Sequence, residues 1–222
     1  MRQYKIAIII GTRAELIKTF TVMLELQRRE IPYYFIHTGQ HNLGDLCKMF
    51  GVKEPDEILT KEPKKSTKFY SKIKKALLWN IRIVFKIRSV LKRILGLEYV
   101  MYHGDTMTTA SASIASSRLL NPFKKYQNIH LEAGLRSDNI REPFPEEIAR
   151  RIADRFSDIL LTVSDRSTGN VQGRFNTRVI QVGNTIADSA RVALMYAVNK
   201  RTNPLTKEKF ALITVHRHEN IK

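Results

Sequence analysis

The feature that most constrains the fold is a regular alternation between short apolar segments and longer segments with a helical period. This alternation is typical of parallel βαβ units, in which a helix returns the chain to the same edge of the sheet. We therefore predict an α/β fold: a Rossmann-like parallel sheet with helices on both faces. The predicted strands are residues 4–11, 33–38, 99–103, 128–132, 158–164, 178–182 and 210–215. The predicted helices are residues 13–29, 43–50, 67–95, 106–119, 145–157, 166–174 and 185–200.

The last part of the chain has a different organisation. Thr202-Asn203-Pro204 has the composition of a linker, and only the apolar segment 210–215 and seven more residues follow it. A parallel strand needs neighbours, and this segment has no helix or strand after it with which to build a layer. We predict one Rossmann-like domain over residues 1–201, and in residues 202–222 a linker and the first strand of a truncated second domain.

The positive charge of the chain is concentrated in one segment. The formal net charge is +17, and residues 61–93 hold twelve Lys or Arg against one acid, Glu62. Apolar residues recur there at near-helical spacing, which predicts an amphipathic basic helix within residues 61–95. Three interpretations remain open: a solvated surface helix, a helix that binds an anionic membrane surface, and a nucleic-acid contact. The third is the least favoured, because aromatic residues are few and no recognition motif is present.

Neither a membrane span nor an export signal is evident. The most apolar long segment, residues 76–95, is interrupted by five Lys or Arg residues. The early apolar segment leads directly into Gly11-Thr12-Arg13, which is typical of a buried strand entering a loop. A single cysteine, Cys47, excludes an internal disulfide. We expect a cytoplasmic location.

Polar turns that contain glycine follow most of the predicted strands. The first strand leads into Gly11-Thr12-Arg13, the third into His103-Gly104-Asp105, and the fourth into Glu132-Ala133-Gly134. In open parallel sheets, ligands bind outside the carboxyl ends of the strands. Charged residues beside glycine at strand after strand therefore predict one shared active-site crevice.

Common cofactor motifs are absent from these turns. Gly11-Thr12-Arg13 lacks the further glycines of the dinucleotide fingerprint, and no P-loop sequence occurs, so no nucleotide cofactor is expected. Arg13 and Lys18 could bind an anion at the start of a helix, or form an ordinary charged helix face. His216 and His218 form a His-x-His pair without a third ligand, so no metal site is predicted.

Seven blocks of this sequence, taken together and in order, resemble the UDP-N-acetylglucosamine 2-epimerase family. The resemblance spans residues 4–220. The blocks are Gly11-Thr12-Arg13-Ala14-Glu15-Leu16-Ile17-Lys18, Thr38-Gly39-Gln40-His41, His103-Gly104-Asp105-Thr106, His130-Leu131-Glu132-Ala133-Gly134-Leu135-Arg136, Pro143-Phe144-Pro145-Glu146-Glu147, Gly183-Asn184-Thr185 and Thr214-Val215-His216-Arg217.

The resemblance implies the amino-terminal half of a glycosyltransferase-B-type fold, with the start of a second, nucleotide-binding domain. It also implies a non-hydrolysing epimerase for polysaccharide precursor synthesis, which interconverts UDP-N-acetylglucosamine and UDP-N-acetylmannosamine. UDP is eliminated to leave 2-acetamidoglucal and is then added back, with protonation on the opposite face. The partners it implies are a UDP-sugar substrate and, as a further candidate, a second copy in a homodimer.

Site residues are carried over from the resemblance by position. Proton transfer on two faces calls for more than one acid/base group, and groups that stabilise the departing diphosphate are also needed. The acid/base candidates are Asp105 and Glu146, with Glu132 as a third acidic contributor. The candidates for charge stabilisation and substrate binding are Arg13, Lys18 and His216. Arg136 and Arg150 would orient carboxylates or contact phosphate, and Gln40 and His41 would belong to a regulatory substrate site.

Simpler roles compete with several of these assignments. Asp105 could cap the helix that follows it, and Glu146 and Glu147 could favour the start of theirs. Ala14 and Ala149 depart from the family pattern, which usually has proline and asparagine at these positions. Because the uridine-binding domain is missing, we expect negligible activity from these 222 residues alone. The alternatives are a hydrolysing 2-epimerase that releases N-acetylmannosamine, and a non-catalytic protein that binds anions or a membrane surface.

Overall fold

The protein is described by a computed structural model that covers residues 3–61, 69–137, 139, 144–173 and 176–199. The strands are β1 (Ile6–Ile10), β2 (Tyr33–His37), β3 (Glu57–Ile58), β4 (Tyr99–His103), β5 (Gln127–Ala133), β6 (Ile159–Thr162) and β7 (Arg178–Gln181). The helices are α1 (Arg13–Arg28), α2 (Gly44–Phe50), α3 (Phe69–Arg93), α4 (Met107–Ser116), α5 (Glu146–Phe156), α6 (Asp165–Val171) and α7 (Thr185–Asn199).

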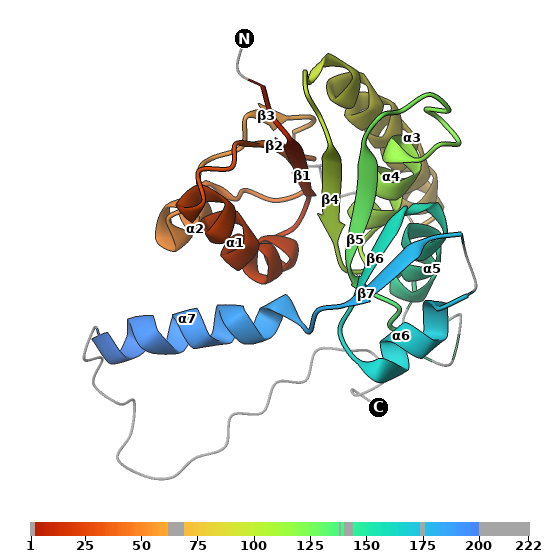
Figure 1. The fold of residues 1–222 in the computed structure, drawn as a ribbon. Helices are drawn as coiled ribbons and strands as arrows, with labels where there is room; N and C mark the ends of the chain where they lie inside the picture. Colours follow the sequence, from red (N-terminus) through yellow and green to blue (C-terminus); the bar gives the residue numbers. More distant parts are fainter. Residues whose placement is uncertain (1–2, 62–68, 138, 140–143, 174–175, 200–222) are drawn as a thin grey trace. The chain divides into compact units, whose positions relative to one another are not determined.

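The strands form one parallel sheet in the order β3-β2-β1-β4-β5-β6-β7 (Figure 1). The chain builds outward from β1 to β3 and then crosses back to place β4 on the other side of β1. The direction of building therefore reverses between β1 and β4, and this switch point is where open α/β sheets bind ligands. The loops after β1 and β4 lie on either side of it.

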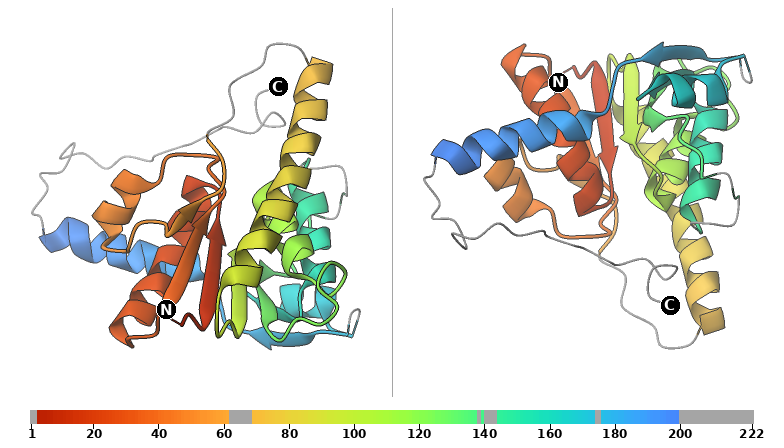
Figure 2. Two further views of the ribbon diagram at one scale, coloured as in Figure 1. Left: turned by 90° about the horizontal axis from the view of Figure 1, so that it is seen from above. Right: turned by 90° about the horizontal axis from the view of Figure 1, so that it is seen from below.

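Helices cover both faces of the sheet (Figures 1 and 2). The helices α1 and α2 lie on one face, and α3, α4 and α5 pack side by side on the other. Ile6–Ile10 is an uninterrupted apolar sequence because both faces of β1 are covered. Ala7 and Ile9 join Ile83 and Ile87 of α3 in the main core cluster, and all four are essentially inaccessible to solvent.

The helix α4 lies between α3 and α5 and is buried on nearly all sides. Its sequence, MTTASASIAS, consists mostly of Ala, Ser and Thr, and eight of its ten residues are buried. Small side chains allow the neighbouring helices to approach closely. The Ser113 and Ser116 hydroxyls donate to carbonyl oxygens of the preceding turn, which satisfies polar groups that would otherwise be costly to bury. α4 begins at the switch point, so this packing fixes the position of the loop after β4.

The predicted fold class is confirmed: the sheet is parallel and Rossmann-like, with helices on both faces. Six predicted strands and all seven predicted helices match observed elements, whereas β3 was missed. β3 has only two residues and lies at the edge of the sheet, so it leaves no periodic signal. The predicted strand 210–215 lies outside the described residues. The contacts divide the chain into Met1–Ser189 and Ala190–Lys222, and the predicted boundary after residue 201 stays a prediction.

Within the described ranges, no helix has the length and apolarity that crossing a lipid bilayer requires.

Candidate active site

The loop after β1 is tied to the loop after β4 by a buried carboxylate, Glu15. Its Oε2 atom accepts hydrogen bonds from the backbone amides of Gly11 (2.6 Å) and Thr12 (2.9 Å). Two hydroxyls at the start of α4 donate to Oε1: that of Thr106, the N-cap residue, and that of Thr109, in the first turn. Burial raises the pKa of Glu15, and these hydrogen bonds oppose the rise. The Gly11 and Thr12 amides serve this internal carboxylate and are therefore not available to an anion bound at the start of α1.

Glu132 lies at the carboxyl end of β5 in a strained backbone conformation. Its φ angle is +62°, in the left-handed region that non-glycine residues rarely adopt, and the register of β5 against β6 shifts around it, between Leu131 and Ala133. Such strain costs on the order of 1–3 kcal/mol and concentrates at functional sites. The carboxylate accepts a hydrogen bond from Lys18 Nζ at 2.6 Å and one from Asn184 Nδ2 at 3.1 Å. The side chains of α1, β5 and the loop after β7 therefore meet at Glu132.

His103 lies beside Glu132 at the end of β4 and is 1% exposed. Its Nε2 atom is 3.1 Å from Thr185 Oγ1, and its Nδ1 atom is 3.6 Å from Glu132 Oε2. Burial, and to a smaller extent the electrostatic influence of Lys18 and His130, lowers the pKa of His103 to about 3. His103 is therefore a neutral imidazole at physiological pH.

Asp105 is held by a guanidinium from α5. Arg150 Nη2 donates to Asp105 Oδ2 at 2.5 Å. The other terminal nitrogen, Nη1, donates to Glu147 Oε2 at 3.3 Å. Glu147 is fully buried and also accepts hydrogen bonds from the Ser137 amide and from Arg151. The Arg150–Asp105 contact has the geometry that an orienting role requires, and the role itself stays a prediction.

A second buried carboxylate of α5, Asp154, holds the loops after β4 and β5. Asp154 Oδ1 is 2.8 Å from His130 Nδ1, and the opposite ring nitrogen of His130 is 2.8 Å from the Gly104 carbonyl oxygen. Arg136 donates to Asp154 Oδ2 at 2.7 Å. Burial alone would raise the pKa of Asp154, but the hydrogen bonds and charges of His130 and Arg136 hold it below its ordinary value. Among the carboxylates of the described residues, Asp154 is the one that Arg136 contacts.

The remaining predicted residues lie in the turns and first helical turns that follow the strands. Arg13 is exposed and donates to the Asn42 carbonyl oxygen at 3.3 Å. Gln40 Oε1 accepts from Thr108 Oγ1, and the carbonyl oxygen of His41 lies 2.6 Å from His37 Nε2. Glu146 Oε2 is buried and has no hydrogen-bond partner in the described part of the chain. His216 lies outside the described residues.

Three buried acids of this site were missed by the sequence analysis. Glu15 follows Thr12 at the spacing of a capping box, a signal that predicts its backbone contacts but not its link to α4. Glu147 and Asp154 are seven residues apart and therefore share one face of α5. Ala149 and Ala153 are buried on the same side of α5. Two acids on a buried face predict carboxylates whose charges are compensated by cations or hydrogen-bond donors.

Other surface features lie away from these residues. A cavity of about 270 Å³ is lined by Tyr4, Tyr34, Glu57 and Arg93 among others, at the amino-terminal ends of the strands and opposite the site. The described residues contain no group of three or more His, Cys, Asp or Glu side chains arranged to hold a metal ion.

Fold and site together define a class of protein: a Rossmann-like α/β protein whose acidic and basic side chains meet at the switch point of a parallel sheet. The sequence profile of the UDP-N-acetylglucosamine 2-epimerase family matches residues 24–222. The chain therefore belongs to the UDP-N-acetylglucosamine 2-epimerase family.

Individual relatives agree with this assignment. The chain is 32% identical to the UDP-N-acetylglucosamine 2-epimerase of Methanococcus maripaludis, over 98% of this chain and 57% of the relative. It is 29% identical to the UDP-2,3-diacetamido-2,3-dideoxy-D-glucuronate 2-epimerase of Pseudomonas aeruginosa, over 97% of this chain and 58% of the relative. The crystal structure of the Neisseria meningitidis UDP-GlcNAc 2-epimerase bound to UDP-GlcNAc matches with a TM-score of 0.74 and 29% identity, over 88% of this chain and 51% of that one. The chain thus spans slightly more than half the length of its relatives, and it corresponds to their amino-terminal half.

Proposed function

We propose that this chain is the amino-terminal part of an enzyme that interconverts UDP-N-acetylglucosamine and UDP-N-acetylmannosamine. The observation that supports this most directly is the meeting of Glu132, Lys18 and His103 at the switch point, with Asp105 on the adjoining loop and in contact with Arg150 of α5. Carboxylates can move protons there, and cations can stabilise a departing diphosphate. The relatives that match this chain are named as 2-epimerases.

In the proposed reaction, a base removes the proton from carbon 2 of the sugar while the bond between carbon 1 and the UDP oxygen breaks. The products of this step are UDP and 2-acetamidoglucal, which has a double bond between carbons 1 and 2. UDP then adds back to carbon 1 as a proton returns to carbon 2 on the opposite face. Asp105, Glu132 and Glu146 are the proposed proton-handling groups, and no oxidant or reductant is needed.

The remaining assignments concern charge and regulation. Arg13, Lys18 and His216 are proposed to stabilise the diphosphate, and Arg150 to orient Asp105. Gln40 and His41 follow β2, next to β1, and are proposed to contact a second, regulatory substrate molecule. Arg136 is proposed to act through Asp154, to which its Nη1 atom donates.

Activity assays test the proposal. The 222-residue chain is expected to convert no measurable UDP-N-acetylglucosamine, because it spans only 57% of the length of its Methanococcus maripaludis relative. A fusion of this chain to the carboxy-terminal part of the Methanococcus maripaludis relative is expected to form UDP-N-acetylmannosamine. In D₂O, that product should carry deuterium at carbon 2. Glu132→Gln in the fusion should abolish both signals. A fusion that folds and binds UDP but neither epimerises nor exchanges this proton would refute the function.

Product analysis of the same fusion separates the close alternatives. A hydrolysing 2-epimerase would release free N-acetylmannosamine and UDP instead of a UDP-sugar. A preference for the Pseudomonas relative's substrate would appear as faster turnover of UDP-2,3-diacetamido-2,3-dideoxy-D-glucuronate.

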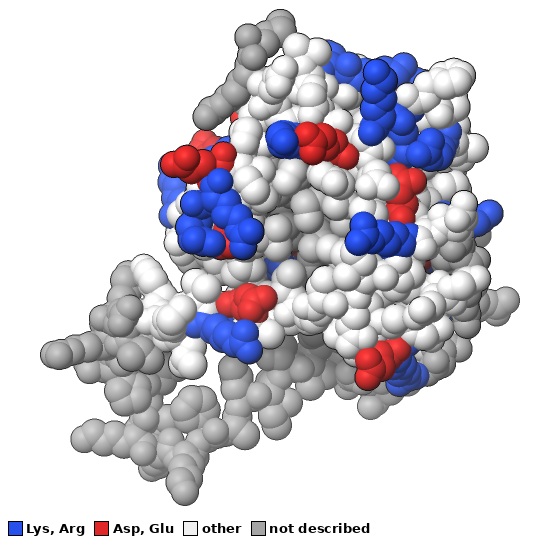
Figure 3. Space-filling view, in the orientation of Figure 1, with Lys and Arg blue, Asp and Glu red and all other residues white. Residues whose placement is uncertain are grey.

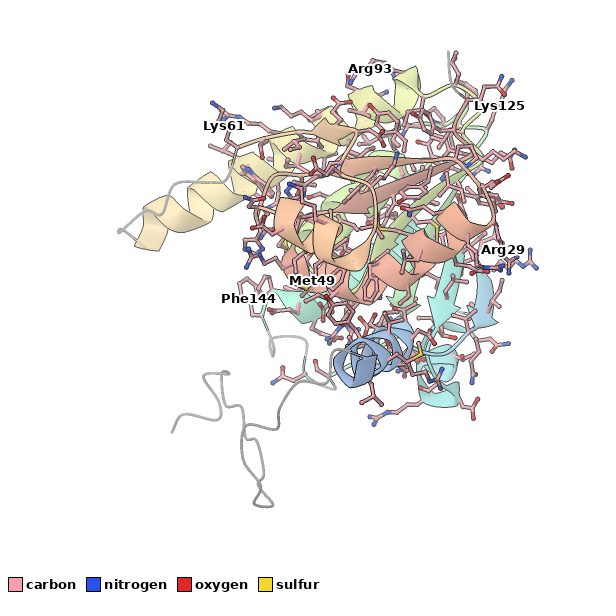
Figure 4. The ribbon with its side chains drawn as sticks, turned by 90° about the vertical axis from the view of Figure 1, so that its left-hand side faces the viewer. Arg29, Met49, Lys61, Arg93, Lys125 and Phe144 are labelled. Atoms are coloured by element: carbon pink, nitrogen blue, oxygen red, sulfur yellow. The ribbon has the colours of Figure 1, made fainter. Side chains whose placement is uncertain are left out.

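The exposed face of α3 supports a second candidate function, contact with an anionic membrane surface. Leu77, Leu78, Ile81 and Phe85 are between 45% and 60% exposed and lie on the side opposite the buried Ile83 and Ile87. The amino-terminal turns of α3 project beyond the sheet, and Lys61 and Arg93 lie on the same side of the sheet as this helix (Figures 2 and 4). Lys and Arg also gather around the carboxy-terminal end of α3 (Figure 3). An apolar stripe flanked by cations suits an anionic interface.

Vesicle binding tests this second candidate. Replacing Lys72, Lys74 and Lys75 by glutamine is expected to weaken retention on phosphatidylserine vesicles on the order of 100-fold, since each cation near such a surface contributes about 1 kcal/mol. The matched control replaces three exposed lysines elsewhere, Lys5, Lys48 and Lys125, and should have little effect.

Two results of this experiment would count against a membrane role. One is equal binding to neutral phosphatidylcholine vesicles. The other is a salt-resistant dimer, seen by sedimentation, that Phe85→Ser dissociates, because a homodimer would then cover this face. The cytoplasmic location stays a prediction.

A further inference from the structure

Glu147 is a fully buried carboxylate in the first turn of α5, and its environment compensates its charge. Its side chain has no solvent exposure. An ionised carboxylate in such a place costs several kcal/mol unless charged partners and hydrogen bonds replace water. Glu147 has both: Oε1 accepts from Arg151 at 2.8 Å, and Oε2 lies near Arg150 (3.3 Å) and the Ser137 amide (3.2 Å). Helix initiation alone does not require this set of partners, so Glu147 has a further role.

The two guanidiniums at Glu147 differ in their surroundings. Arg150 continues to Asp105, whose Oδ2 atom accepts its Nη2 at 2.5 Å. Arg151 is 42% exposed, whereas Arg150 is 14% exposed. Arg150 Nε is buried without a hydrogen-bond partner in the described chain. The plane of the Arg150 guanidinium is therefore fixed only at its two terminal nitrogens, one by Glu147 and one by Asp105.

Glu147 also anchors the loop after β5. The Ser137 amide belongs to the segment that follows Glu132 and Arg136 along the chain, and it donates to the same Oε2 atom that faces Arg150. One carboxylate thus joins the loop after β5 to the guanidinium that holds the loop after β4. These are the two loops whose acids must keep a fixed separation for protons to be delivered to opposite faces of one carbon.

We propose that Glu147 is a positioning residue, which fixes the Asp105 carboxylate through Arg150 and holds it in register with the loop that follows Glu132. This inference rests on the proposed function in placing Asp105 at the reacting sugar. Without the negative charge of Glu147, the guanidinium of Arg150 loses one of its two charged partners. It then keeps only the contact with Asp105 and can rotate together with that carboxylate. Asp105 then loses its fixed direction.

The experiment is NMR spectroscopy of the 222-residue chain, labelled with ¹³C and ¹⁵N and observed without substrate. In Glu147→Gln, rotation of the Arg150 guanidinium is expected to become about tenfold faster, because one charge-assisted hydrogen bond is removed. The Asp105 carboxyl ¹³C signal should move in the same variant. Arg150→Lys should move that signal as well, since lysine cannot bridge the two carboxylates.

Arg151→Lys is the matched control. It removes the other guanidinium from Glu147 but leaves the Arg150–Asp105 contact, so the Asp105 signal should stay in place. If Glu147→Gln does not fold, Glu147→Asp replaces it, because the charge is kept while the side chain is one methylene shorter. An unmoved Asp105 signal in a folded Glu147 variant, or an equal shift in Arg151→Lys, overturns the proposal.

The readout separates this inference from the proposed function, because no substrate or turnover is involved. An inactive fusion with the expected NMR changes would refute epimerisation but leave the positioning of Asp105 established. In an active fusion, Glu147→Gln should lower kcat about 100-fold with little change in KM. This pattern is expected because the substitution displaces a reacting group and leaves the groups that bind the substrate in place.

Discussion

Replacement of Asp154 by asparagine is expected to lower the free energy of unfolding by about 3–5 kcal/mol, the usual cost of removing one partner from a buried ion pair. The Asp154 carboxylate is fully buried between His130 and Arg136, and it also accepts the Gly134 amide. Asparagine has nearly the same shape but no charge. Arg136, only 8% exposed, would keep its charge without a counterion.

Urea unfolding followed by circular dichroism measures this loss. Asp45→Asn is the control: Asp45 is an exposed acid in the first turn of α2, where a carboxylate contributes less than about 1 kcal/mol. A loss below about 1 kcal/mol in Asp154→Asn would mean that the network does not support the fold. Because the network includes the Gly104 carbonyl, we also expect the backbone signals around Asp105 to shift in any variant that stays folded.

His103 is expected to make the protein less stable in acid, by about 3 kcal/mol between pH 6.5 and pH 4. The pKa of His103 is lowered to about 3 in the folded protein, chiefly by burial, from an ordinary value of 6.5. In this window the unfolded chain therefore binds a proton that the folded protein does not. The contribution of His103 is fully present above pH 6.5 and is lost progressively as the pH falls toward 3.

The measurement is the difference in unfolding free energy between the unmodified chain and His103→Asn as a function of pH. Taking the difference removes the contributions of other acids that titrate in the same range. The free energy of unfolding should fall less steeply with acid in His103→Asn, and the exposed His41→Asn should behave like the unmodified chain. An imidazole NMR titration of His103 with a midpoint near 6.5 would contradict the expectation.

The parts of the fold that were predicted correctly are those with a local signal. The uninterrupted apolar sequence of β1, the helical period of α3, and the polar turns between elements each depend on residues within one segment. The edge strand β3 has no such signal, because its two residues are strand only through pairing with Ile36 and His37 of β2. The seven sequence blocks correctly indicated the family for a similar reason, since each is a short local motif, and five of them lie in or next to turns that follow described strands.

Most candidate site residues were proposed from their positions in those turns, but their partners could not be predicted in the same way. Lys18 and Glu132 are 114 residues apart in sequence, and only the parallel arrangement of β1, β4 and β5 brings them to 2.6 Å. Arg136 was predicted to orient carboxylates or to contact phosphate, and its partner in the structure is Asp154, which no motif had marked.

The sequence by itself determined the α/β class, the order of most elements, the family and the edge of the sheet where charged residues collect. These properties follow from periodicity and short motifs, which are encoded within a segment. Tertiary structure alone decided which charge is paired with which, that His103 is neutral, and that Glu147 is buried. Burial and ion pairing depend on distances between segments that are remote in the chain, and the cost of removing a charge from water can be assigned only when those distances are known.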